Sequence, residues 1–103
     1  MSQSNDLASL AAQFARSPAW RDITIRQLAI LGVIADEPGP HTIRGVAARL
    51  QLSKPVVCRA IDKLWPLIER RPDPRDRRNL FLCLTLDGRR LRDDLILQAR
   101  ADG

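Results

Sequence analysis

The chain has 103 residues, of which 45% are hydrophobic and 28% charged, and its formal net charge at pH 7 is +5. This length predicts a single domain with a modest core, which packing against a partner subunit would help to stabilise. The sequence argues against a membrane, secreted or zinc-dependent protein, because no apolar run reaches the roughly 20 residues of a membrane span, the N-terminus lacks a signal-peptide core, and two cysteines with one histidine cannot supply four zinc ligands. We therefore expect a soluble cytoplasmic protein without a metal or other cofactor.

The first predicted helix lies within residues 1–20. Asn5 or Asp6 can cap it, and Ser17-Pro18 should end it, because a residue before proline avoids the helical conformation. Its apolar residues recur at intervals of three and four, which gives one stripe made of Leu7, Leu10, Ala11 and Phe14.

Two further helices are predicted before residue 52. Thr24 caps one that runs to about Ala35, with Leu28, Leu31 and Ile34 on one face. The segment 37–40, E-P-G-P, is a turn by composition, and His41 after it is predicted to lie on the surface. Thr42 then caps a helix whose apolar residues are Ile43, Val46, Ala47 and Leu50.

A fourth helix follows the short turn Gln51-Leu52. Ser53 is its predicted N-cap, and Pro55 lies in its first turn, where a missing N–H costs nothing. Its inward face is predicted to be Val57, Ile61 and Leu64, and Trp65-Pro66 closes it. We expect Trp65 and Trp20 to be packing anchors rather than stacking platforms for single strands.

A two-stranded hairpin and a last helix complete the predicted elements. The strands are expected at 67–71 and 80–85, with Leu80, Leu82 and Leu84 facing the core and Phe81 and Cys83 alternating with them. Thr85 caps the last helix, which carries Leu91, Leu95 and Ala99. Five arginines lie in nine residues at the hairpin: Arg70, Arg71, Arg75, Arg77 and Arg78.

The positive charge is concentrated in this part of the chain. Residues 44–78 hold ten basic and four acidic residues, a net +6, whereas the rest of the chain holds seven basic and eight acidic, a net −1. A capped amphipathic helix followed by an arginine-tipped hairpin is typical of a winged helix, whose helix enters the major groove while the hairpin reaches phosphates or the minor groove. A basic face that is merely solvated is the alternative.

Several segments carry a resemblance to the MarR family of bacterial transcription regulators. They are T-I-R-Q-L-A-I-L (24–31), T-I-R-G-V-A-A-R-L-Q-L-S (42–53), V-V-C-R-A-I-D-K-L (56–64), E-R-R-P-D-P-R-D-R-R (69–78) and L-T-L-D-G (84–88). The helix-turn-helix part alone is shared by many families, whereas D-P-R-D-R-R followed by L-T-x-x-G is more specific. The resemblance spans about 65 of the 103 residues.

The resemblance implies a mainly α fold with a small β-hairpin wing, a winged helix-turn-helix. We expect one domain over residues 1–103, divided into an N-terminal helix (1–20), a DNA-binding core (24–84) and a C-terminal helix (85–103). Such proteins are usually homodimers that read palindromic sites in double-stranded DNA. This chain resembles a short member with reduced dimerisation helices. Because the family's effector pocket lies beside those helices, we expect no small-molecule effector. The dimer would use Leu7, Leu10, Phe14, Leu91 and Leu95.

The predicted DNA-binding residues lie on the recognition helix (53–64) and the wing (70–84). The family pattern falls on Ser53, Lys54, Pro55, Val56, Cys58 and Arg59 in the helix, and on Asp76, Arg77 and Arg78 in the wing. To these we add Arg44, Lys63 and Arg75. Arg59 offers a fork to guanine, Lys54 a charge to phosphate, and Asp76 a partner that orients a neighbouring arginine.

Several of these residues have a second interpretation. Arg59 could instead pair with Asp62, and Val56 could pack beneath the wing rather than contact a thymine methyl. For Arg44 and Arg49, exposure to solvent is as good an interpretation as contact with the DNA backbone. Cys58 is either a small residue tolerated beside the groove or a redox-sensitive one.

The predicted function is a sequence-specific double-stranded DNA-binding transcription regulator, a repressor associated with the nucleoid. The alternative is a winged-helix protein-interaction module that acts on another regulator or on polymerase without its own operator. An enzyme is not expected, because no nucleophile–base set, metal spacing or phosphate loop occurs in the sequence.

Overall fold

The computed structural model describes residues 8, 12 and 23–102 of the chain. Its elements are α2 (Ile25–Asp36), α3 (Ile43–Leu50), α4 (Lys54–Lys63), β1 (Ile68–Asp73), β2 (Asp76–Leu84) and α5 (Leu86–Asp102). The chain divides into two compact units, one of residues 24–89 and one of residues 1–23 with 90–103. The predicted first helix, with Leu7, Leu10, Phe14 and Trp20, lies outside the described residues. No described helix is long and apolar enough to cross a membrane.

Helix α2 begins with a capping box and supplies the largest share of the core. The Thr24 hydroxyl accepts a hydrogen bond from Gln27 N, and the Gln27 side chain accepts one from Thr24 N, both at 3.0 Å. The buried side chains of α2 are Ile30, Leu31, Val33 and Ile34, a wider face than the predicted one, and Leu28 is only half-buried. The face is wide because α2 contacts α3, α4 and β2.

Helices α3 and α4 form the helix-turn-helix at the predicted positions. Thr42 and Ser53 cap them, accepting hydrogen bonds from Gly45 N (2.9 Å) and Val56 N (3.3 Å). Between the helices Gln51 takes the left-handed conformation (φ 57°), which turns the chain sharply after α3. The predicted inward face of α4 is confirmed, since Val57, Ile61 and Leu64 are all at most 3% exposed.

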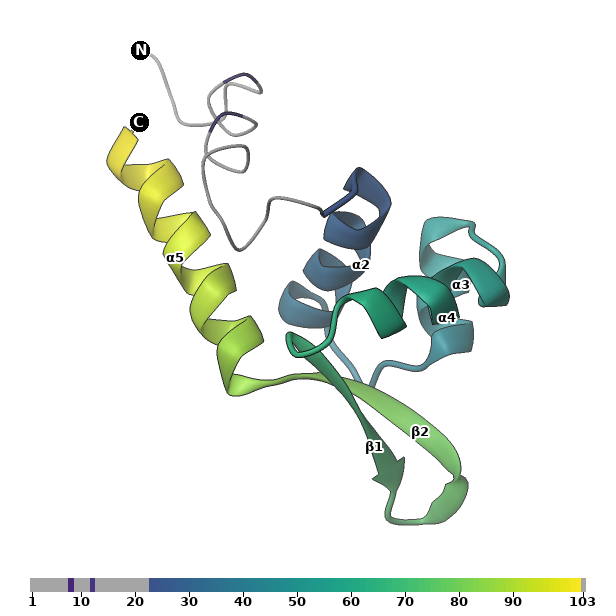
Figure 1. Ribbon diagram of the computed structural model, residues 1–103. Coiled ribbons are helices and arrows are strands. Elements are labelled where there is room, and N and C mark those ends of the chain that lie inside the picture. Colours follow the sequence, from purple (N-terminus) through teal and green to yellow (C-terminus); the bar gives the residue numbers. More distant parts are fainter. Residues whose placement is uncertain (1–7, 9–11, 13–22, 103) are drawn as a thin grey trace. The chain divides into compact units, whose positions relative to one another are not determined.

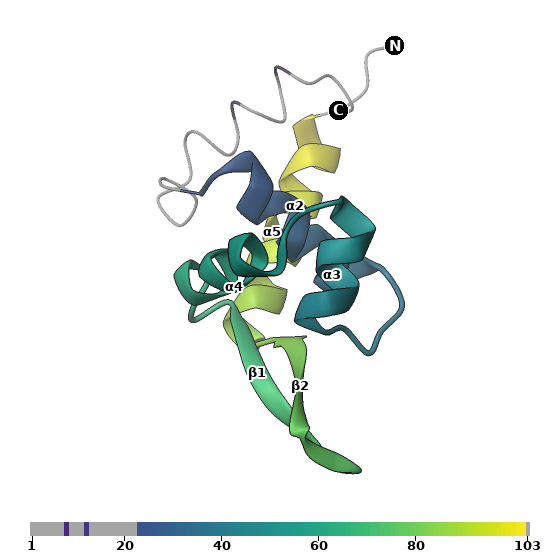
Figure 2. The same ribbon diagram turned by 90° about the vertical axis from the view of Figure 1, so that its right-hand side faces the viewer.

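The hairpin β1–β2 extends away from α2, α3 and α4 in both views (Figures 1 and 2). Both strands reach further towards the turn than predicted. Leu82 is 2% exposed and Leu84 half-buried, but Leu80 is 43% exposed, so the prediction that all three leucines face the core is wrong for Leu80. Leu80 pairs with Pro72, beyond the edge of the helices, where no core remains to cover it.

His41 joins the helices to the hairpin. Leu82 N donates to His41 O at 2.8 Å, and this isolated bridge adds a short third segment beside β2. The His41 ring is half-buried, with Nε2 2.9 Å from Glu37 O. His41 is therefore more covered than the sequence predicts, because the turn at 37–40 brings the residue back against the sheet.

The base of the hairpin is joined closely to the start of α5. Thr85 N donates to Leu67 O at 3.0 Å, the Thr85 hydroxyl donates to Pro66 O, and Gly88 N donates to Thr85 Oγ1 at 3.0 Å. The predicted cap at Thr85 is confirmed. Gly88 is buried, and a Cβ built on it would lie 2.1 Å from Leu67 O. The close contact between the start of α5 and the base of β1 therefore depends on the hydrogen bonds of Thr85 and on the absence of a side chain at Gly88.

Trp65 does not pack into the core. It is 67% exposed, so the expectation of a packing anchor is wrong for this residue. Leu64 and Ile68, on either side of it in sequence, are 3% and 1% exposed and occupy the core positions instead. The indole is thereby left on the surface at the end of α4.

Candidate nucleic-acid interface

The outer face of α4 carries the residues predicted to meet DNA. Lys54, Pro55, Cys58, Arg59 and Lys63 are exposed, and Val56 is half-buried. Since Val57, Ala60, Ile61 and Leu64 turn inward, the core fixes which face of the helix is presented.

The start of α4 adds positive potential to this surface. The first turns of α2, α3 and α4 contain no acidic residue. A helix N-terminus carries a partial positive charge and unpaired N–H groups, which favour phosphate. Lys54 and Arg44 stand in the first turns of α4 and α3 and add full charges there.

Arg59 is not paired with Asp62, the alternative that the sequence left open. Asp62 Oδ1 instead accepts a hydrogen bond from Arg70 Nη2 at 2.9 Å. The Arg59 side chain makes no hydrogen bond or ion pair to any residue that the structure describes, so its guanidinium is available to a ligand.

Arg49 is paired with another residue of the protein, whereas Arg44 is not paired with any described residue. Arg49 forms a two-bonded ion pair with Glu37, Nε–Oε1 at 2.9 Å and Nη2–Oε2 at 2.8 Å, which ties the end of α3 to the end of α2. Arg44 is exposed and has no such partner within the described part of the chain. Arg44 is therefore the better candidate of the two for a backbone contact.

The wing tip, residues 73–78, is organised by its two aspartates. Asp73 Oδ1 accepts from Arg75 N at 2.8 Å, which shapes the turn. Asp76 accepts from the Arg78 side chain at 3.0 and 3.2 Å and from Arg78 N at 3.1 Å. The expected role of Asp76 in orienting an arginine is thus present in the geometry. The Arg75 and Arg77 side chains bond no other described residue.

The Asp76 carboxyl gives a direct test of this geometry. The hydrogen bonds from the Arg78 side chain and backbone lower its pKa below the ordinary range of aspartate. The stabilisation that this pair contributes is therefore present at neutral pH and is lost as pH falls through the lowered pKa. We expect the Asp76 carboxyl to titrate in NMR below the ordinary range of aspartate, and Arg78→Ala to raise its pKa. An unchanged pKa in Arg78→Ala would show that the pair does not form in solution.

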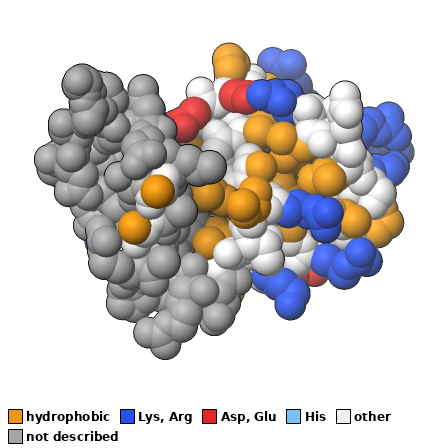
Figure 3. Space-filling view, turned by 90° about the horizontal axis from the view of Figure 1, so that it is seen from above, with side chains coloured by type: hydrophobic (Ala, Val, Ile, Leu, Met, Phe, Trp, Pro, Cys, Tyr) orange, Lys and Arg blue, Asp and Glu red, His pale blue; other side chains and the backbone are white. Residues whose placement is uncertain are grey.

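Figure 3 shows one face of the described surface. Apolar side chains gather in its middle, and Lys and Arg side chains stand around them with few acidic ones. This view is from the end opposite the wing, which points downwards in Figure 1. No group of three His, Cys, Asp or Glu residues comes together in the described part of the chain as a metal ion would require.

Sequence reasoning missed the contacts that reach across elements. Arg70 in β1 bonds Asp62 in α4, and Glu37 binds Arg49. For each ion pair, the sequence shows only that an acidic and a basic residue lie on elements expected to be neighbours. It does not show which of several arginines the acidic residue binds.

These elements define a winged helix-turn-helix. A MarR family model matches residues 21–79, more than half of the chain. The chain therefore belongs to the MarR family of DNA-binding transcription regulators. A comparison with curated protein sequences finds no match.

Several solved structures are similar to this chain over most of its length. The M. tuberculosis protein RV1404 has a TM-score of 0.80 and 28% identity, over 96% of this chain and 67% of that one. S. aureus MepR, solved as a DNA complex, has 0.73 and 27%, over 90% and 75%. Streptococcus pneumoniae FabT, also solved in complex with DNA, has 0.71 and 26%, over 96% and 73%. The chain thus corresponds to about two thirds to three quarters of these proteins.

Proposed function

We propose that the protein is a homodimeric repressor that binds a palindromic site in double-stranded DNA. Helix α4 lies in the major groove with Arg59 on base edges and Lys54 on phosphate, and the wing tip places Arg75 and Arg77 on the minor groove or backbone. The contact surface is completed by Ser53, Pro55, Val56, Cys58, Lys63 and Arg44. Arg78 is paired with Asp76 and supports the wing tip. The protein acts by binding rather than by catalysis, in the cytoplasm on the nucleoid.

One observation carries this proposal: α4 and the wing tip present arginines whose side chains bond no other described residue. An arginine that is already paired has little to offer a base or a phosphate, as Arg49 illustrates. The DNA complexes of MepR and FabT support the same use of the fold. For the homodimer, α5 carries the half-buried apolar residues Leu91 and Leu95.

The experiment is selection of genomic duplex fragments by the purified protein at moderate salt, followed by sequencing. An enriched palindrome is the expected result, and its half-site spacing gives the geometry of the dimer. Binding that is salt-sensitive without enrichment would show that the protein reads backbone alone. No binding would contradict the proposal and favour the protein-interaction module.

The wing makes a separate prediction. Arg77→Ala should weaken binding by a similar factor for the enriched duplex and for a mixed-sequence duplex, because a phosphate or minor-groove charge carries little sequence information. The slope of log affinity against log salt should fall by about 1. Titrations of both duplexes at several salt concentrations measure this. A loss confined to the enriched duplex would instead place Arg77 on a base.

A further inference from the structure

The wing is held against the helices at its base alone. Ile68 and Leu82 are 1% and 2% exposed, and Leu82 pairs with Arg70 across the ladder. Beyond that pair towards the turn, no described residue of either strand is buried. Packing therefore does not fix the direction of the outer half of the hairpin.

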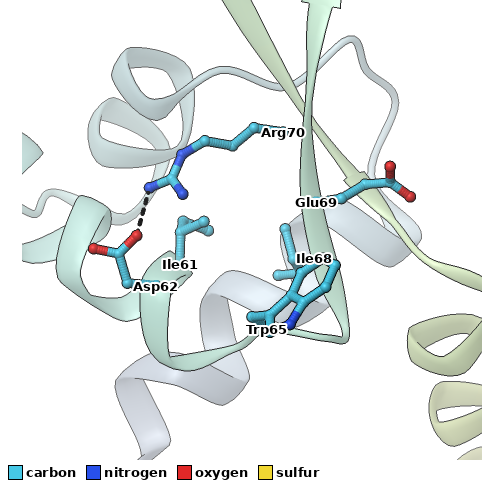
Figure 4. A pocket seen from close by; sticks show the side chains of 6 residues that line it. All are labelled: Ile61, Asp62, Trp65, Ile68, Glu69 and Arg70. Atoms are coloured by element: carbon cyan, nitrogen blue, oxygen red, sulfur yellow. Dashed lines mark hydrogen bonds and ion pairs between the residues drawn. The ribbon is translucent and has the colours of Figure 1, made fainter.

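A hollow separates the wing from the end of the recognition helix. It has a volume of about 410 Å³ and is lined by Ile61, Asp62, Trp65, Ile68, Glu69 and Arg70 (Figure 4). Outward from the buried Ile61 and Ile68 no side chain fills this space, so van der Waals contact does not hold the outer part of β1 against α4 there.

Arg70 reaches across this gap. Its Nη2 donates to Asp62 Oδ1 at 2.9 Å and lies 3.7 Å from Cys58 Sγ, so one guanidinium meets two residues a helical turn apart on α4. The other ion pairs of the wing stay within one strand, Arg71 with Glu69 and Arg78 with Asp76. Among the described residues, Arg70 alone joins the wing to α4 by an ion pair.

We infer that the Asp62–Arg70 pair, here called the brace, is a positioning element for DNA recognition. It holds the wing at one distance from α4 and so decides which stretch of duplex Arg75 and Arg77 reach while α4 occupies the major groove. The guanidinium of Arg70 is bound to Asp62 in the brace, so Arg70 itself does not contact DNA. The inference rests on the proposed function, because it concerns how the same surface selects its site.

If only charge mattered, substitutions of Asp62 and of Arg70 would have opposite effects on DNA binding. If the pair positions the wing, both substitutions would have the same effect. Asp62→Ala removes a negative charge near DNA and, by charge alone, would strengthen binding, whereas Arg70→Ala would weaken it. If the pair is a brace, both variants lower the preference for the enriched duplex over a mixed-sequence duplex, by about fivefold, which is the most that a partly exposed ion pair supplies. Both variants also lose the wing's protection of the deoxyribose from hydroxyl radicals, which attack from the minor groove, and keep the protection of guanine N7 from dimethyl sulfate that α4 gives in the major groove.

Arg71→Ala is the matched control. It removes the same charge from the same strand, but its partner Glu69 lies in β1, so the brace stays intact. We expect Arg71→Ala to lower the affinity for both duplexes by the same factor and to keep the wing's protection of DNA from hydroxyl radicals. Thermal unfolding of each variant confirms that it is folded before binding is compared.

A second measurement uses Arg77→Ala in two backgrounds. If the brace places the wing tip, Arg77→Ala costs less affinity in an Asp62→Ala protein than in the parent. An equal cost in both backgrounds, or tighter binding by Asp62→Ala with the wing protection retained, would overturn the inference alone. A parent protein that enriches no duplex would instead overturn the proposed function, and the inference with it.

Discussion

Gly88→Ala is expected to lower the midpoint of thermal unfolding by roughly 15 °C, which corresponds to about 3 kcal/mol in a domain of this size. The Cβ would lie 2.1 Å from Leu67 O and 3.0 Å from Leu67 C, and both are backbone atoms that no rotamer change can move away. Either the start of α5 or the base of β1 must shift. A shift would break the hydrogen bonds of Thr85 to Leu67 and Pro66. Circular dichroism or calorimetry measures the change.

Gly32→Ala is the matched control for that prediction. Gly32 also lies within a helix, α2, but no described atom lies within 4 Å of its added Cβ. Alanine there should gain stability, by up to about 1 kcal/mol, through its higher helix propensity. The two substitutions are chemically the same, so opposite signs isolate the close approach at Leu67. If Gly88→Ala were neutral, the joint between the wing and α5 would be looser than the structure has it.

Local signals in the sequence were enough to predict the starts of α2, α3, α4 and α5 and the inward face of α4. A cap depends on one side chain and a backbone N–H three residues away, and Thr24, Thr42, Ser53 and Thr85 all bond at that interval. The buried face of α4 follows from the spacing of its apolar residues in the same way.

What local pattern could not predict was where the core ends and which charges pair. Alternation along β2 assigns Leu80 and Leu82 to one face, but it does not say that the helices stop covering that face before Leu80. Likewise Asp62 has Arg59 three residues away on its own helix and Arg70 on the neighbouring strand, and only the three-dimensional approach of β1 selects Arg70. The availability of Arg59 for DNA follows from that choice and not from its own sequence neighbours.

Arg59→Ala is expected to reduce affinity for the enriched duplex by about fivefold to 150-fold, the 1–3 kcal/mol that a bidentate arginine–guanine contact supplies. Affinity for a mixed-sequence duplex should fall much less, so the preference between the two duplexes shrinks. Competition titrations at one fixed salt concentration measure both affinities. The loss should map to one base pair of the half-site, where substitutions cease to matter to the variant.

Arg59→Lys separates base recognition from simple charge. Lysine keeps the charge but lacks the planar fork, so a contact to guanine O6 and N7 is weakened, whereas a phosphate contact survives. Arg89→Ala, in the first turn of α5, controls for the loss of one positive charge on a different helix. If Arg59→Lys binds like the parent while Arg59→Ala is weak, Arg59 contacts the backbone, and sequence selection must come from its neighbours on α4. If Arg59→Lys is nearly as weak as Arg59→Ala and Arg89→Ala binds normally, the guanidinium of Arg59 reads a base, which the absence of any described partner for this side chain already favours.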